Sequence, residues 1–139
     1  MTKIAVVYWS GTGNTEAMAN EVVAGAQAAG AEASMLTCDE FGPAETVDYD
    51  AFALGCPAMG DEVLEESEFE PMYESVKDLL EGKKVVLFGS YDWGTGEWME
   101  TWEEDARNAG INVVGTVIAN LEPDDDACAA CQQAGASLA

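Results

Sequence analysis

The sequence Trp9-Ser10-Gly11-Thr12-Gly13-Asn14-Thr15 stands between an apolar run and an amphipathic pattern. The apolar run, residues 4–8, predicts a buried strand of a parallel sheet, and Ala19, Val22 and Ala26 predict a helix after the loop. A glycine-containing loop at the start of a helix presents backbone N–H groups and a partial positive charge to an anion. Because polar side chains add further donors, we interpret this loop as a phosphate site; the alternative is an ordinary connection between a strand and a helix.

The loop lacks two residues that are typical of common nucleotide-binding loops. It contains no lysine, so it is not the GxxxxGK[ST] loop of nucleoside-triphosphate sites. Glu16 stands where the third glycine of the dinucleotide motif GxGxxG would be, and that glycine is what lets helix and strand pack closely. The loop therefore favours a terminal phosphate held by neutral donors.

The composition is that of one acidic globular domain. A chain of 139 residues, 48% of them hydrophobic, fits a single domain over residues 1–139 with a full core. Its formal charge of −22 argues against binding to nucleic acid or anionic membranes and favours basic partner proteins. In the alternative interpretation, the charge serves only to keep the protein soluble. No apolar run nears the roughly 18 residues of a membrane span, and no signal peptide is visible. We therefore expect a cytoplasmic monomer.

The four cysteines and the absence of histidine restrict metal and acid–base chemistry. Cys128-x-x-Cys131 has the spacing of a redox or metal half-site, but three aspartates precede it and oppose thiolate formation. A four-cysteine zinc site would need Cys38 and Cys56 to converge on this pair. The helical spacing of Cys128 and Cys131 favours core packing, and we expect no metal site and no catalytic residue.

Apolar runs alternate with helical patterns along the whole chain. Strands are expected at residues 4–8, 32–37, 51–56, 84–89 and 113–118. Helices are expected from the end of the first loop to about residue 30 and at residues 69–80, 98–109 and 124–138, with a loop or short helix at 39–47. This alternation predicts an α/β fold in which a five-stranded parallel sheet carries helices on both faces. The expected strand order, 2-1-3-4-5, places a ligand at the carboxyl ends of strands one and three.

Three loops would meet at that edge of the sheet: residues 9–15, 57–62 and 90–96. The third loop carries Tyr91 and Trp93 among glycines, which suits stacking on a flat ring better than core packing. In the alternative, Trp93 folds back onto its own domain. A phosphate site beside a stacking surface at the switch point of an α/β sheet points to flavin mononucleotide (FMN).

Three motifs in this order resemble those of the short-chain, clostridial-type flavodoxins over essentially the whole chain. They are Val7-Tyr8-Trp9-Ser10-Gly11-Thr12-Gly13-Asn14-Thr15-Glu16, Leu54-Gly55-Cys56-Pro57-Ala58-Met59-Gly60-Asp61-Glu62, and Leu87-Phe88-Gly89-Ser90-Tyr91 with Trp93-Gly94. The resemblance implies a flavodoxin-like three-layer sandwich. It also implies an electron carrier, not an enzyme, that binds FMN non-covalently. Such a carrier shuttles single electrons at low potential between redox enzymes, cycling mainly between semiquinone and hydroquinone.

The same resemblance implies roles for individual residues. Residues 10–15 would bind the FMN phosphate with help from Ser90, while Met59 and Trp93 would cover the two faces of the isoalloxazine ring. The candidate cofactor-binding residues are Trp9, Ser10, Gly11, Thr12, Gly13, Asn14, Thr15, Pro57, Ala58, Met59, Gly60, Asp61, Glu62, Ser90, Tyr91, Asp92, Trp93 and Gly94.

Several loop residues are expected to act on the flavin ring edge. By the resemblance, the carbonyl of the Gly60-Asp61 peptide would face flavin N5, and Glu62 would hold N3. Asp92 departs from the related motif, which usually has glycine at this position. A glycine-specific backbone angle there would strain Asp92, and its carboxylate would shift the potential or the affinity of the flavin.

The acidic residues suggest how the protein tunes its cofactor and meets its partners. No basic residue lies in the three loops, so no cation there stabilises the negative charge of the fully reduced flavin. The potential of the second one-electron reduction of the flavin should therefore be low. An acidic face beside the cofactor would attract basic surfaces of ferredoxin- or flavodoxin-dependent oxidoreductases, unless it is merely solvated. Its members would be Glu62, Glu65, Glu66, Glu68 and Glu70.

Two other functions are compatible with a fold of this class. A flavin-dependent quinone reductase would need a nicotinamide site, and usually a longer chain with a dimer interface. A signalling receiver domain would need a phosphate-accepting aspartate at the end of strand three, where this chain has Gly55-Cys56.

Overall fold

Five strands and their connecting helices build three layers in the protein, a computed structural model that describes residues 2–11, 13–59, 63–92 and 94–139. The strands are β1 Lys3–Tyr8, β2 Glu32–Thr37, β3 Ala51–Gly55, β4 Lys84–Tyr91 and β5 Asn112–Asn120. The α-helices are α1 Asn14–Ala28, α2 Pro43–Thr46, α3 Phe69–Val76, α4 Glu97–Asn108 and α5 Asp125–Leu138. Two 3-10 segments, η1 Cys38–Glu40 and η2 Lys77–Leu80, follow β2 and α3.

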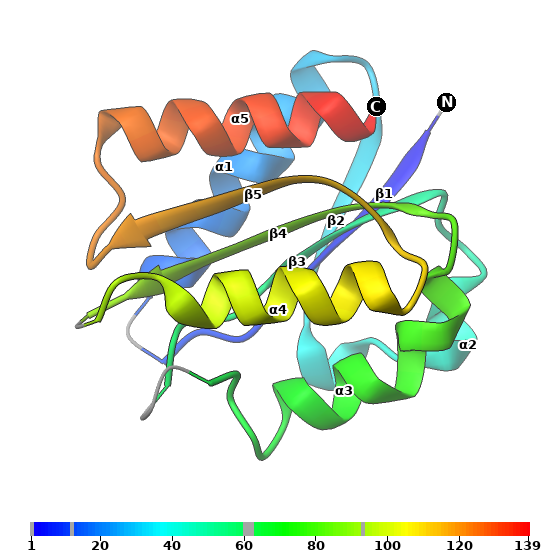
Figure 1. Ribbon diagram of the computed structural model, residues 1–139. Helices are drawn as coiled ribbons and strands as arrows, with labels where there is room; N and C mark the ends of the chain where they lie inside the picture. The colour runs from blue at the N-terminus through cyan, green and yellow to red at the C-terminus, as the bar shows by residue number, and fades with distance from the viewer. Residues whose placement is uncertain (1, 12, 60–62, 93) are drawn as a thin grey trace.

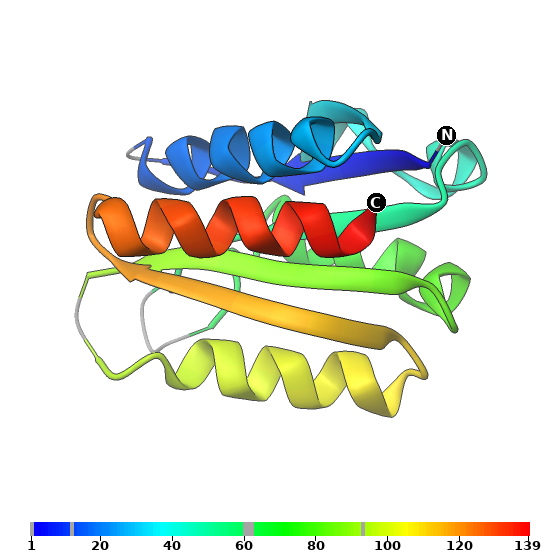
Figure 2. The same cartoon turned by 90° about the horizontal axis from the view of Figure 1, so that it is seen from above.

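The sheet has the predicted order, β2-β1-β3-β4-β5, and all neighbouring strands are parallel. Helices α1 and α5 cover one face, and α3 and α4 cover the other with the short α2 (Figure 1). Seen from above, α1, α5 and α4 run alongside the strands (Figure 2). Within the described residues, no helix is long and apolar enough to cross a membrane.

Alternating side chains on the strands divide the core into two halves. Along β1, Ile4 and Val6 pack towards α1 and α5, whereas Ala5 and Val7 pack towards α3 and α4. All four side chains are fully buried. A strand covered on both faces reads as one continuous apolar run, which is why the sequence predicted it as a parallel strand.

Two glycines allow α1 and α5 to approach each other closely. A Cβ atom at Gly25 would lie 1.9 Å from the carbonyl oxygen of Gln132, and one at Gly135 would lie 2.1 Å from that of Val22. Backbone carbonyls in a helix cannot move aside, so each position excludes any larger residue. The contact between the helices thus depends on glycine at both positions.

Strand β4 extends further than predicted, because Ser90 and Tyr91 belong to it and not to the following loop. The strand was expected to end at Gly89, but this residue lies inside β4 and allows close packing: a Cβ atom there would lie 2.1 Å from the carbonyl oxygen of Cys56. Ser90 and Tyr91 pair with Ala119 and Asn120. Strand β5 is accordingly longer than residues 113–118.

The cysteines lie on opposite sides of the sheet. Cys38 and Cys56 are buried in the α3/α4 half of the core. Cys131 is buried in the α1/α5 half, as its helical spacing predicted, whereas Cys128 is only half-buried. Burial raises the pKa of Cys38 to about 11 and that of Cys131 to about 12. Because the sheet stands between them, these thiols cannot converge on one metal ion.

Glu65 fixes the start of α3. Its carboxylate accepts hydrogen bonds from the backbone N–H groups of Ser67 at 2.9 Å, Glu68 at 2.7 Å and Phe69 at 2.9 Å, and also from the Ser67 hydroxyl. Only 6% of Glu65 is exposed, so its place in the expected acidic face was wrong. Burial alone would raise the pKa of Glu65, but these hydrogen bonds outweigh it and lower the pKa to about 2.

Replacing Gly135 by alanine should destabilise the protein. The added methyl group forces α1 and α5 apart, and we expect the free energy of unfolding to fall by about 1–3 kcal/mol. Urea denaturation of the parent and the variant measures this loss. Gly115→Ala is the matched control, because a Cβ atom at Gly115 meets nothing within 4 Å; equal stability of the two variants would contradict the close contact.

Replacing Glu65 by glutamine should lower stability in a pH-dependent way. In the folded protein the pKa of Glu65 lies below its ordinary value of 4.5. The stabilising contribution of Glu65 is therefore complete above about pH 4.5 and is lost as the pH falls towards about 2. We expect Glu65→Gln to lower the free energy of unfolding by about 2 kcal/mol at pH 7. The difference from the parent should shrink below pH 4.5, as followed by urea denaturation at several pH values. The exposed neighbour Glu66, changed to glutamine, is the control.

Candidate functional site

The three predicted loops meet at the carboxyl edge of the sheet. Strands β1 and β3 are neighbours, and the helices that follow them lie on opposite faces, which leaves a crevice between the first and second loops. The N–H group of Trp9 donates to the carbonyl of Gly55 at 3.0 Å, and that of Ala58 donates to Ser90 at 3.0 Å. These backbone hydrogen bonds join the first loop to the second and the second to the end of β4.

The first loop folds around the hydroxyl of Ser10. This oxygen accepts hydrogen bonds from the N–H groups of Gly13 at 3.0 Å and Glu16 at 3.3 Å. Gly13 has φ 95°, a left-handed conformation that glycine adopts without a Cβ clash, and α1 begins at the next residue. The loop thus gathers N–H donors at the positive end of α1, as an anion site requires. Thr12 lies outside the described residues.

Thr15 and Ser90 lie beneath the loop as a hydroxyl pair. Their oxygens are 3.0 Å apart, and either hydroxyl can be the donor. Thr15 is 1% exposed and Ser90 is 5% exposed. The pair therefore connects the first turn of α1 to the end of β4 in the protein interior.

Two cavities share Trp9 and Gly11 at this edge. One has a volume of about 370 Å³ and polar walls, and the other has a volume of about 230 Å³ and mostly apolar walls. The polar cavity is lined by Tyr8, Trp9, Ser10, Gly11, Gly13, Glu16, Thr37, Cys38, Asp39 and Glu68. The apolar cavity is lined by Trp9, Gly11, Asn14, Pro57, Ala58, Met59, Ser90, Tyr91, Asp92 and Leu121. Together they suit a ligand with a flat apolar part and a polar tail.

The ends of the second loop are fixed by hydrogen bonds. Met59 and Val63 form an antiparallel bridge, in which the N–H of Met59 donates over 2.9 Å and that of Val63 donates over 3.0 Å. The N–H of Glu65 donates to the sulfur of Cys56 at 3.3 Å. Three candidate residues between the bridged ends, Gly60, Asp61 and Glu62, lie outside the described residues.

The third loop follows Tyr91, the last residue of β4, whose ring packs against Trp98 with centroids 5.7 Å apart. The side-chain amide of Asn120 donates to the carbonyls of Tyr91 and Asp92, both at 3.2 Å. Of the non-glycine residues that the structure describes, Leu121 alone has a positive φ, so the backbone strain expected at Asp92 is absent. Trp93 lies outside the described residues, and Gly94 lines neither cavity.

Several residues of the two cavities were not among the sequence candidates. Thr37 ends β2, and Cys38 and Asp39 follow it. The predicted strand order already placed that strand end beside the first loop. Leu121 follows β5 and lines the apolar cavity. Nothing in its local sequence signals that position, because it depends on where the last strand ends.

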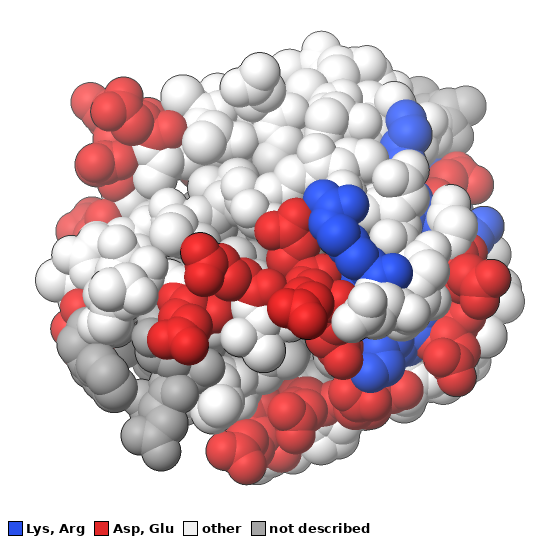
Figure 3. All heavy atoms as spheres, viewed as in Figure 1, with Lys and Arg blue, Asp and Glu red and all other residues white. Residues whose placement is uncertain are grey.

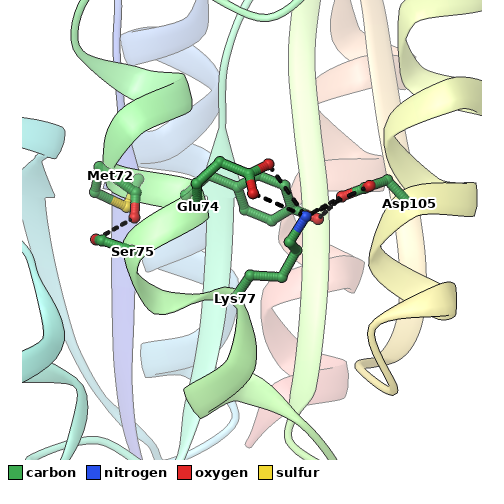
Figure 4. A network of polar contacts seen from close by, with 6 residues as sticks. Met72, Glu74, Ser75, Lys77 and Asp105 are labelled. Atoms are coloured by element: carbon green, nitrogen blue, oxygen red, sulfur yellow. Dashed lines mark hydrogen bonds and ion pairs between the residues drawn. The ribbon is translucent and has the colours of Figure 1, made fainter.

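Positive charge is confined to the opposite end of the molecule. The five basic residues lie at or just before the starts of strands, or at the ends of helices that run back towards those starts: Lys3, Lys77, Lys83, Lys84 and Arg107. On the face drawn in Figure 3, the blue side chains all lie in the right half of the view. Lys77 forms salt bridges with Glu74 at 3.0 Å and with Asp105 at 3.2 Å, and so links α3 to α4 (Figure 4). The candidate site therefore offers neutral donors and carboxylates but no cationic side chain.

Comparison with known proteins gives consistent matches over the whole chain. A sequence model of the flavodoxin family matches residues 6–135. The flavodoxin of Megasphaera elsdenii is 46% identical over 136 residues, 98% of each chain. That of Clostridium beijerinckii is 48% identical over 121 residues, 86% of this chain and 88% of that protein. The solution structure of two-electron reduced Megasphaera elsdenii flavodoxin superposes with a TM-score of 0.90 at 46% identity, covering 96% of this chain and 98% of that chain.

Proposed function

The chain belongs to the flavodoxin family, whose members are FMN-binding electron carriers, and we propose that it shuttles single electrons at low potential between redox proteins. One observation carries the proposal: a polar cavity and an apolar cavity adjoin at the switch point of the sheet and share Trp9 and Gly11. FMN has a phosphate and a polar ribityl chain at one end and a flat ring at the other. When bound, it supplies the redox chemistry.

The phosphate would bind to residues 10–15. In support, the N–H groups of Gly13 and Glu16 point at one oxygen atom, that of Ser10, and stand at the start of α1. A phosphate oxygen in that place would be held by neutral donors and the helix dipole. The hydroxyl pair of Thr15 and Ser90 lies directly beneath and would orient these donors.

The ring would bind along the apolar cavity. Met59 from the second loop and Tyr91 from the end of β4 line this cavity. The Met59–Val63 bridge fixes the base of the second loop. The roles proposed for Trp93 over the ring, for the Gly60-Asp61 carbonyl at N5 and for Glu62 at N3 rest on the family resemblance.

The charge distribution supports a low potential. All basic side chains lie at the far end of the molecule, so none can offset negative charge added at the carboxyl edge. Adding a second electron to the flavin is therefore opposed electrostatically. We propose that the protein works mainly between the one-electron and two-electron reduced forms of FMN.

The same distribution suggests basic redox proteins as partners. A carrier with acidic groups around its site and cations at the opposite end is oriented by the field of a basic partner before contact. Glu68 and Asp39 line the polar cavity and are exposed, so they would be accessible to such a partner.

The purified protein should hold one FMN per chain and no FAD. Riboflavin, which lacks the phosphate, should bind about 100-fold more weakly than FMN because it leaves the loop donors unused. Extraction of the flavin followed by chromatography identifies the cofactor, and fluorescence titration of the apoprotein gives the affinities. Recovery of FAD, or equal binding of riboflavin and FMN, would contradict the proposed phosphate site.

Electron transfer to a basic acceptor protein should slow as salt is added. Screening weakens the attraction between the acidic edge and its partner over a Debye length of about 10 Å at 0.1 M salt. At low salt, Glu68→Lys should lower the second-order rate constant by about threefold to tenfold. Stopped-flow kinetics measure this rate. The control is Glu32→Lys, which makes the same charge change at the exposed start of β2; equal effects would show that net charge alone matters.

A further inference from the structure

Tyr8 and Glu16 form a hydrogen-bonded pair beside the phosphate loop. The Tyr8 hydroxyl, at the end of β1, donates to Glu16 Oε2 over 3.0 Å, and Tyr8 is only 9% exposed. Glu16 lies in the first turn of α1 and lines the polar cavity together with Ser10 and Gly13. A carboxylate therefore shares this cavity with the loop that would bind the FMN phosphate.

Glu16 stands where its side chain can reach the donors of the loop. It is the third residue after Gly13, the N-cap of α1, and a glutamate at this spacing commonly turns back to accept a hydrogen bond from the N-cap N–H. In that position its carboxylate would occupy the N–H groups that an anion needs. In the structure the Gly13 N–H instead donates to Ser10 Oγ at 3.0 Å, and Tyr8 holds the Glu16 carboxylate.

We propose that Tyr8 is a positioning residue whose hydroxyl holds the Glu16 carboxylate away from the phosphate loop and so keeps the loop open to the FMN phosphate. The inference rests on the proposed function, because it assumes a phosphate at residues 10–15. Tyr8 need not touch the cofactor. It acts through Glu16, by lowering the population of molecules in which the chain's own carboxylate blocks the loop.

Among the described residues that line the polar cavity, the Tyr8 hydroxyl is the group that holds the Glu16 carboxylate in place. No lysine or arginine lines the polar cavity, so no cation there attracts the carboxylate. Asp39 and Glu68 line the same cavity and repel a carboxylate that turns their way. Burial and the hydrogen bond to Glu16 raise the pKa of Tyr8, so the hydroxyl keeps its proton and remains a donor.

The test is Tyr8→Phe, which removes the hydroxyl and keeps the ring. Apoprotein is titrated with FMN and with riboflavin, which carries the same ring without the phosphate. If the Glu16 carboxylate then blocks the loop in about nine of every ten molecules, the Kd for FMN should rise about tenfold. The Kd for riboflavin should stay the same. Inorganic phosphate should also raise the melting temperature of the parent apoprotein more than that of the variant.

Two further variants separate this role from support of the fold. Glu16→Ala removes the side chain that Tyr8 restrains, so Tyr8→Phe should leave FMN affinity unchanged in the Glu16→Ala background. Tyr73→Phe is the matched control, because it removes a hydroxyl that donates to Asp105 over 2.8 Å between α3 and α4, away from both cavities of the site. It should leave the Kd for FMN at the parent value.

The outcomes distinguish the two proposals. An unchanged Kd for FMN in Tyr8→Phe, an equal loss for FMN and riboflavin, or a loss that persists without Glu16 would overturn the positioning role. Equal binding of FMN and riboflavin by the parent would instead overturn the phosphate site itself.

Discussion

Strands β1 and β3 lie side by side, yet the helices that follow them pack on opposite faces of the sheet. No backbone crosses the edge between them, so the two loops part and leave a crevice. Strand β4 is next to β3, which brings the third loop to the same place. Every feature of the candidate site, from the N–H donors of the first loop to the bridged ends of the second, depends on this divergence.

A protein of charge −22 faces a particular difficulty in binding an anion. A lysine in the loop would help the phosphate, but it would also favour the negative charge of the fully reduced flavin and raise its potential. Backbone N–H groups and hydroxyls avoid this conflict, because they hold a phosphate at short range and add no net charge near the ring. Under the proposed function, confinement of the cations to the far end of the molecule would serve the same purpose; Lys77, for example, is paired there with Glu74 and Asp105.

Local patterns were enough to predict the strand order and the meeting of the three loops, because buried parallel strands leave continuous apolar runs. Features set by distant contacts were not predictable. Gly89 was predicted as a strand end, but it lies inside β4 and is required there by the backbone of Cys56, which directly follows the neighbouring strand β3. Glu65 reads as one of several surface glutamates, although its carboxylate caps α3. The pairing of Tyr8 with Glu16 depends on a side-chain rotamer, which no sequence pattern records.

The first loop satisfies its own donors internally. Ser10 Oγ accepts from the N–H groups of Gly13 and Glu16, so these groups are not left unpaired near the protein surface. A phosphate that bound here would replace the Ser10 hydroxyl as the acceptor of these hydrogen bonds and would not add new ones. The favourable free energy of binding would come from replacing a neutral acceptor by a charged one. Such an exchange is sensitive to any competing carboxylate, because a carboxylate offers the same advantage as the phosphate. An acidic side chain in the first turn of α1 is compatible with the site only if another group restrains it.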